Sequence, residues 1–116
     1  MKRVLMAIVV VVAASVAPLA ANAKSRTEIG YGMATCGAWT TDEDPNGRVR
    51  QTRAAWILGY LSRASYDHAG DMLDPVDAPA IEAWIDNYCK AHPLDRLSRA
   101  AEALEVELAA RVANKK

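Results

Sequence analysis

The sequence contains little cysteine and no excess of charge of either sign, and both features exclude classes of protein. Its 116 residues include only two cysteines, too few for a disulfide-dense miniprotein or for a zinc site built from four thiolates. Fourteen basic residues balance fourteen acidic ones without forming a basic cluster, so the chain lacks the electrostatic footprint of a nucleic-acid-binding protein. The hydrophobic content of 52% indicates one globular domain rather than a disordered chain.

The motifs that mark common enzyme classes are also missing. The serines do not lie in a G-x-S-x-G context, and the sequence has neither a phosphate-binding loop nor a dinucleotide-binding glycine pattern. The two histidines form no H-x-x-x-H or H-E-x-x-H pair, and the two cysteines form no C-x-x-C pair. The sequence therefore gives no indication of an enzyme, a catalytic residue, a metal site or a cofactor.

Residues 1–23 are predicted to be a secretory signal peptide. Lys2 and Arg3 precede an apolar run over 4–14, and Ala21-Asn22-Ala23 supplies the small residues that a signal peptidase reads. The alternative is an uncleaved anchor, since residues 4–21 are almost long enough to cross a bilayer. The cleavage motif favours removal, so we expect a periplasmic or secreted mature chain, 24–116, with no stable membrane anchor.

The two cysteines of such an exported chain are expected to pair. A disulfide between Cys36 and Cys89 would close a loop of about 54 residues and contribute roughly 4 kcal/mol in the chain-entropy model. A mature chain of this size buries only about 60–65% of its unfolded surface, so its core needs such a covalent link.

The mature chain is predicted to be a single all-α domain with three main helices and a short N-terminal element. Glycines interrupt the first stretch, so only a short or irregular helix is expected around Cys36. A helix is predicted over 49–64, and another begins after Asp77, which can cap it, with Pro79 in its first turn. The last helix is predicted to begin at Pro93.

Apolar residues recur on these helices at the spacing of a buried stripe. The positions predicted to face the core, or to contact a client or partner, are Trp56, Ile57, Tyr60, Leu61, Trp84, Ile85, Leu97, Leu104 and Leu108. The seam of the last helix is predicted to start at Leu94, with Arg99, Glu102 and Glu105 on its opposite face. Trp39 lies in a polar stretch that fits packing and a surface contact equally well.

Two polar patterns could hold a metal ion, but simpler interpretations are stronger. Residues 42–47 match the first half of a calcium-binding loop, yet the twelfth position, which needs a bidentate carboxylate, is Arg53. A polar turn ahead of a helix explains this pattern better. His68 lies among the aspartates of 67–74, which we interpret as a solvated acidic loop rather than a zinc or acid–base site.

Several residues spread over 35–108 form a pattern known from other small exported proteins. They are Cys36, Trp56, Gly59, Tyr60, Leu61, Asp74, Val76, Cys89, Lys90 and Pro93. This pattern resembles the HdeA/HdeB family, whose members are helical, disulfide-linked periplasmic acid-stress chaperones. Gly59-Tyr60 and His92-Pro93 are also similar to turns in periplasmic immunity proteins, which neutralise secreted toxins that cut peptidoglycan.

The two resemblances imply two functions, both involving a protein partner. As a stress chaperone, the chain would become strongly positive at about pH 2, and its helices would separate and expose their apolar stripes to unfolded clients. As a partner-specific binding or immunity protein, it would act at neutral pH on one envelope protein, with residues 42–44 and 67–74 contacting a basic surface. The apolar content is also compatible with a homodimer.

Removing the disulfide is expected to remove most of the stability of the fold. Cys36→Ser or Cys89→Ser returns loop freedom to the unfolded chain, a loss of roughly 4 kcal/mol. Thermal unfolding followed by circular dichroism without reductant measures the effect. An unchanged melting temperature in either variant would contradict the prediction.

Overall fold

A computed structural model describes residues 27–41 and 43–115, so the predicted signal peptide lies outside the described residues. The described part contains four α-helices: α1 (Cys36–Thr40), α2 (Arg48–Ala64), α3 (Ala78–Ala91) and α4 (Leu97–Ala113). Two short 3-10 helices, η1 (Tyr31–Met33) and η2 (Ser65–Asp67), accompany them. The described residues form no strand, which confirms the all-α prediction and the short helix at Cys36.

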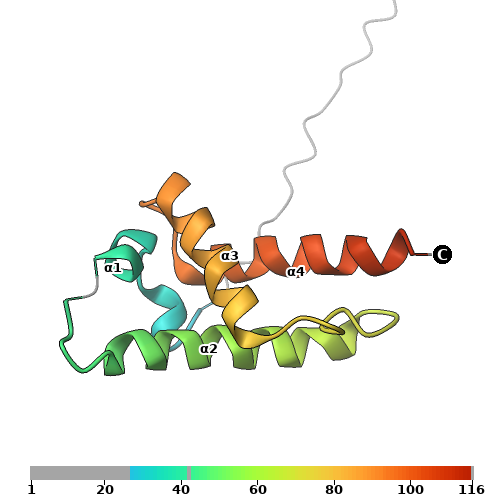
Figure 1. Cartoon of the computed structure of the whole chain (residues 1–116), viewed down its shortest axis with the longest axis horizontal. Helices are drawn as coiled ribbons and strands as arrows, with labels where there is room; N and C mark the ends of the chain where they lie inside the picture. Colours follow the sequence, from blue (N-terminus) through green and yellow to red (C-terminus); the bar gives the residue numbers. More distant parts are fainter. Residues whose placement is uncertain (1–26, 42, 116) are drawn as a thin grey trace, which may run out of the picture.

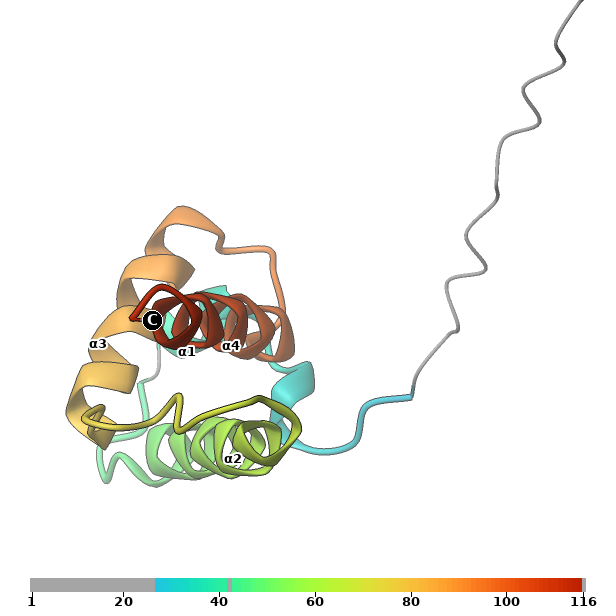
Figure 2. The same ribbon diagram turned by 90° about the vertical axis from the view of Figure 1, so that its right-hand side faces the viewer.

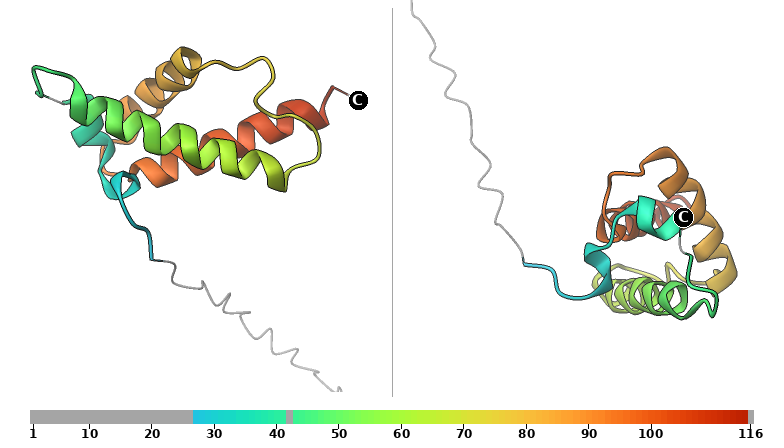
Figure 3. Two further views of the ribbon diagram at one scale, coloured as in Figure 1. Left: turned by 90° about the horizontal axis from the view of Figure 1, so that it is seen from below. Right: turned by 90° about the vertical axis from the view of Figure 1, so that its left-hand side faces the viewer.

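Two of the three long helices lie side by side, and the third crosses both of them. α2 and α4 run side by side in the same direction, and α3 crosses them steeply (Figure 1). Seen along the axes of α2 and α4, α3 lies against one side of the pair and the N-terminal segment lies on the other (Figure 2). α1 lies near the start of α2, whereas the loop between α2 and α3 arches over the opposite end (Figure 3).

An apolar core fills the space between these elements. The three long helices contribute Ala54, Ile57, Leu61 and Ala64 of α2, Ile81, Ile85 and Cys89 of α3, and Leu97, Ala100, Ala101, Leu104 and Leu108 of α4. Cys36 and Trp39 of α1 and Met72 of the α2–α3 loop complete it. Cys36 and Cys89 form the predicted disulfide, which joins α1 to α3.

Side-chain caps fix where two of the helices begin. The Oγ1 atom of Thr35 accepts a hydrogen bond from the Ala38 N–H at 3.1 Å and starts α1. The carboxylate of Asp77 accepts from the Ala80 N–H at 2.9 Å and starts α3, with Pro79 in the first turn. Both bonds satisfy backbone donors that have no partner within the helix, and the predicted start of α3 is confirmed.

The predicted start of the last helix at Pro93 is wrong. α4 begins at Leu97, and Leu94 is 91% exposed and takes no part in the apolar seam. The remaining predicted seam positions, from Leu97 to Leu108, are buried as expected.

Pairing with the N-terminal segment explains the later start. Thr35 and Arg96 form an isolated antiparallel bridge. The Cys36 N–H donates to the Asp95 carbonyl at 2.7 Å, and the Leu97 N–H donates to the Ala34 carbonyl at 2.8 Å. Because these long-range bonds hold the chain extended ahead of Leu97, the local signal of a proline at a helix start does not decide the boundary.

The N-terminal segment also contacts α2, where Gly32 is buried against the indole of Trp56. A Cβ atom on Gly32 would lie 2.3 Å from the ring of Trp56, a distance that forces the ring or the segment to move. Gly59 on α2 has the opposite surroundings, because nothing lies within 4 Å of a Cβ atom placed there.

These two glycines provide a matched pair of substitutions. Gly32→Ala is expected to destabilise the fold by about 1–3 kcal/mol through overpacking against Trp56. Gly59→Ala is expected to stabilise it by about 0.5–1 kcal/mol, since alanine is the better residue in a helix interior. Urea unfolding of both variants tests this, and equal effects would show that Gly32 is not a close contact.

Candidate functional site

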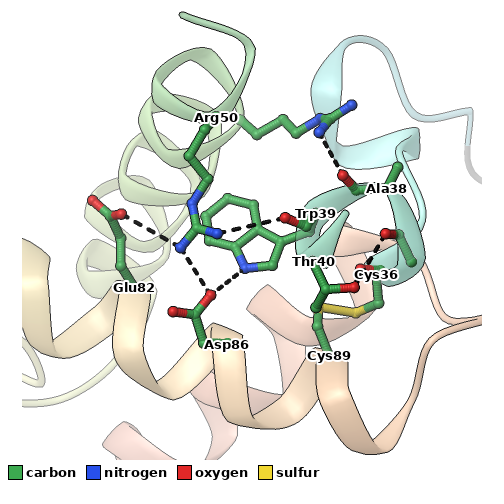
Figure 4. A network of polar contacts seen from close by, with 10 residues as sticks. Cys36, Ala38, Trp39, Thr40, Arg50, Glu82, Asp86 and Cys89 are labelled. Atoms are coloured by element: carbon green, nitrogen blue, oxygen red, sulfur yellow. Dashed lines mark hydrogen bonds and ion pairs between the residues drawn. A yellow bond between two sulfur atoms is a disulfide. The ribbon is translucent and has the colours of Figure 1, made fainter. Parts of the chain in front are cut away.

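The side chain of Trp39 lies at the junction of α1, α2 and α3 (Figure 4). The side chain is 0% exposed. Of the two predicted roles of Trp39, packing and a surface contact, the structure therefore supports packing. The indole Nε1–H donates to Oδ1 of Asp86 on α3 at 2.7 Å. The guanidinium of Arg50 on α2 stacks over the indole, 3.7 Å from the ring centre, and bonds the same Oδ1 atom at 2.8 Å.

This arrangement joins three helices through one carboxylate. Asp86 accepts from both the indole and the guanidinium, so its charge is paired while the polar edge of Trp39 is satisfied. Glu82 lies one turn earlier on α3 and is more distant, 3.8 Å from the Arg50 guanidinium. A second arginine of α2, Arg53, donates to the Ala38 carbonyl at 2.8 Å.

The turn before α2 serves as a cap. Asp44 accepts from the N–H groups of Asn46 and Val49, each at 3.1 Å. These backbone hydrogen bonds, with that of Asn46 foremost, lower the pKa of the Asp44 carboxyl. The Asp44 carboxylate is therefore used in starting α2, as the polar-turn interpretation predicts, while Asp42 lies outside the described residues.

A second carboxylate, Glu105 of α4, joins α4 to α2 and to the loop that follows it. Its Oε2 atom accepts from the Tyr60 hydroxyl at 2.5 Å, and its Oε1 atom lies 2.7 Å from Nε2 of His68. The bond from Tyr60, with the contribution of His68, lowers the pKa of Glu105 although partial burial acts in the opposite direction. The charged form of Glu105 is thus favoured in the folded state.

Two more aromatic side chains of α3 contact carboxylates near α4. The Trp84 indole N–H donates to Glu107 at 2.8 Å, and the Tyr88 hydroxyl donates to Asp95 at 2.7 Å. The rings of Trp84, Tyr88 and His92 stack in sequence along α3, with centroid separations of 5.4 Å and 4.3 Å. Burial, and then the Asp95 carboxylate, raises the pKa of the Tyr88 phenol, so this group remains a hydrogen-bond donor.

The surface beside these contacts is hollowed along one side of α4. Two adjoining grooves, of about 420 Å³ and 540 Å³, share walls formed by Pro75, Val76, Leu108 and Arg111. Trp84 lines the larger groove, and its walls are mainly apolar.

The nine apolar residues predicted to contact a client or partner divide into two groups. Six are buried in the core: Ile57, Leu61, Ile85, Leu97, Leu104 and Leu108. Three are half-buried at helix interfaces: Trp56, Tyr60 and Trp84. The six core residues could therefore meet another protein only if the helices separate.

The carboxylates at these interfaces are absent from the predicted site. The helical pattern places Glu105 on the outer face of α4, but the structure brings it against Tyr60 and His68. His68 likewise does not belong to a purely solvated loop, because its imidazole contacts α4. Three of the aromatic and acidic pairs that meet are 23 to 47 positions apart in the sequence, a separation that helical periodicity does not connect. The fourth, Tyr88–Asp95, extends past the end of α3.

Within the described ranges, no three His, Cys, Asp or Glu side chains gather as a candidate metal site. Likewise, no described helix combines the length and the apolar character needed to cross a bilayer. The chemistry that the described side chains bring together is hydrogen bonding between aromatic donors and carboxylates, with one stacked and paired arginine.

Replacing Asp86 tests whether this carboxylate holds the α1–α2–α3 junction. Asp86→Asn removes the charge that Arg50 and Trp39 share and is expected to lower the free energy of unfolding by about 1–2 kcal/mol. Glu82→Gln removes a neighbouring charge that is farther from Arg50, so we expect a change below about 0.5 kcal/mol. Urea unfolding at pH 7 compares the two, and a larger effect of the Glu82 variant would reject this assignment.

Comparisons with known proteins do not assign the chain to a family. No protein-family model, curated protein or solved structure matches it. A function for this chain therefore has to be inferred from its own residues and their geometry.

Proposed function

We propose that the protein is a small exported chaperone, similar to the HdeA/HdeB family, that opens in acid and binds apolar segments of unfolding proteins. It acts without catalysis, and its binding surface is the set of apolar helix faces that form the core at neutral pH. The intramolecular disulfide supports the proposed export, because such bonds form mainly in oxidising compartments.

One observation carries the proposal: four aromatic side chains at the interfaces between elements donate hydrogen bonds to carboxylates. The pairs are Trp39–Asp86, Tyr60–Glu105, Trp84–Glu107 and Tyr88–Asp95. Three of these bonds join different helices, and the fourth joins α3 to the loop before α4; the charge of the acid group strengthens each of them. Protonation of a carboxylate removes the charge that strengthens such a bond.

The expected loss of stability is large enough to matter. Replacing a charge-assisted hydrogen bond with a neutral one costs about 1 kcal/mol, and the lowered pKa of Glu105 places a loss of this order in the acidic range. A small domain is stable by about 5–15 kcal/mol, and repulsion within a positively charged chain adds to the loss.

Glu105 shows the direction of the pH effect. Its folded pKa is lowered, so its stabilising contribution is fully present above the unfolded pKa of about 4.3. That contribution is lost as the pH falls through the lower, folded pKa. The proposed opening therefore occurs in acid, and the disulfide would keep α1 and α3 linked in the opened chain.

The contacts of the acidic loops give less support to the alternative function, a partner-specific binding protein that acts at neutral pH. Asp44 accepts from the Val49 N–H in the first turn of α2, Asp67 pairs with Arg63 at 2.9 Å, and Asp71 accepts from the Leu73 N–H at 3.1 Å. These carboxylates already have partners within the chain. We therefore favour the acid chaperone over an immunity protein that contacts a basic enzyme.

Light scattering of a mixed periplasmic extract tests the proposal directly. The extract is shifted from pH 7 to about pH 2–3, with and without the purified 24–116 chain, because carboxylates become protonated in this range. We expect the protein to suppress aggregation in acid and to have no effect at pH 7.

A control measurement distinguishes loss of tertiary structure in acid from a mere increase in the net positive charge of the protein. Circular dichroism and tryptophan fluorescence of the same samples report whether the tertiary structure is lost in acid. If the protein stays folded at pH 2–3 and scattering is unchanged, the chaperone proposal is wrong, and a pull-down at neutral pH for one partner becomes the next experiment.

A further inference from the structure

The segment 68–76, which we call the strap, crosses from η2 to the start of α3 over the end of the helix pair (Figure 3). Most of it is exposed, but Met72 is only 2% exposed and belongs to the core. A Cβ atom on Gly70 would lie 2.8 Å from the side chain of Val112, which shows how closely the strap approaches α4. The strap thus covers apolar residues of α4, with Met72 inserted into the core and Leu73 and Val76 packed against it.

Open grooves lie beside the strap. The grooves that share Pro75, Val76, Leu108 and Arg111 lie where the strap meets α4, and Met72 lines the smaller one. Much of the strap is exposed to solvent, a property of segments that open locally more easily than packed helices.

Side chains hold the strap in place. In the described part of the chain, no backbone hydrogen bond joins the strap to α2, α3 or α4; the bond from Val76 N–H to the Leu73 carbonyl lies within it. His68, at the start of the strap, contacts Glu105, whose other oxygen accepts from Tyr60. One carboxylate of α4 therefore ties down both the strap and α2.

The charges around Glu105 show how protonation would act on this tie. Tyr60 faces it from α2, His68 from the strap, and Asp67 of η2 opposes its negative charge from a greater distance. Asp67 is itself paired with Arg63, and on α4 Glu102 lies about one turn away and pairs with Arg99. A neutral Glu105 would no longer offer His68 a negatively charged partner.

We propose that the strap is released by protonation of Glu105 before the helices separate, and that the α4 face beneath it, at Leu108 and Val112, is the first surface to receive an apolar segment of a client. This inference rests on the proposed function and adds an order of events and a location. The position of Met72 indicates the occupant: an apolar side chain carried by a non-helical segment is already packed into the core beside this face in the closed form.

Hydrogen–deuterium exchange of the 24–116 chain at pH 7 tests the release without any client. Glu105→Gln keeps the shape of the side chain but removes its charge, and we expect strap amides to exchange about tenfold faster while α3 remains protected. His68→Ala, which leaves the Tyr60–Glu105 bond in place, is expected to accelerate exchange in the strap alone. Glu102→Gln, on the same helix, is the control and is expected to change nothing in the strap.

A second comparison tests the location of client binding. Val112→Lys places a permanent charge beneath the strap, whereas Val106→Lys places one at a position of α4 that is already 69% exposed. In the acid scattering assay we expect the Val112 variant to lose most of its protective effect and the Val106 variant to keep it. Equal protection by both variants would overturn the assignment of this surface.

The two proposals fail in different ways. If strap exchange is unchanged in both the Glu105 and the His68 variants, the strap inference is wrong, even if the unmodified protein suppresses aggregation in acid. If strap exchange rises as expected but no protection occurs at any pH, the release mechanism is supported and the chaperone function is not.

Discussion

The structure depends on one recurring interaction: the polar end of an aromatic side chain donates to a carboxylate of another element. An indole or phenol brings a large apolar surface to a helix interface, but its N–H or O–H needs an acceptor when it leaves water. Asp86, Glu105, Glu107 and Asp95 supply those acceptors. Aromatic packing and carboxylate acceptors are therefore linked at these contacts.

The two ends of the molecule are stabilised differently. At the end that contains α1, the disulfide, the backbone bonds from Cys36 and Leu97, and the Trp39–Asp86–Arg50 contact hold the chain. At the other end, and within the described residues, the strap is held by side chains alone: the His68–Glu105 contact, the inserted Met72, and the packing of Leu73 and Val76. Under the proposed function, this difference would let acid act first on the strap while the disulfide keeps the chain linked.

Local signals in the sequence predict most helix positions correctly, and one failure is informative. Asp77 and Pro79 mark the start of α3 because capping and proline geometry are properties of a few neighbouring residues. Pro93 carries a similar signal, but α4 begins only at Leu97, because residues near 95 pair with the segment around Cys36. A contact between segments about 60 positions apart overrides a local preference there, and sequence periodicity does not reveal such a contact.

The sequence alone determined the all-α class, the pairing of Cys36 with Cys89 and the apolar stripes of the three long helices, because each follows from residue spacing or from the number of cysteines. Only the tertiary structure decided which polar groups meet. It turned Glu105 toward Tyr60 and His68, placed Asp86 between Trp39 and Arg50, and inserted Met72 into the core. These contacts depend on how α2, α3 and α4 cross, and crossing geometry is set by the packing of whole helix surfaces rather than by any local pattern.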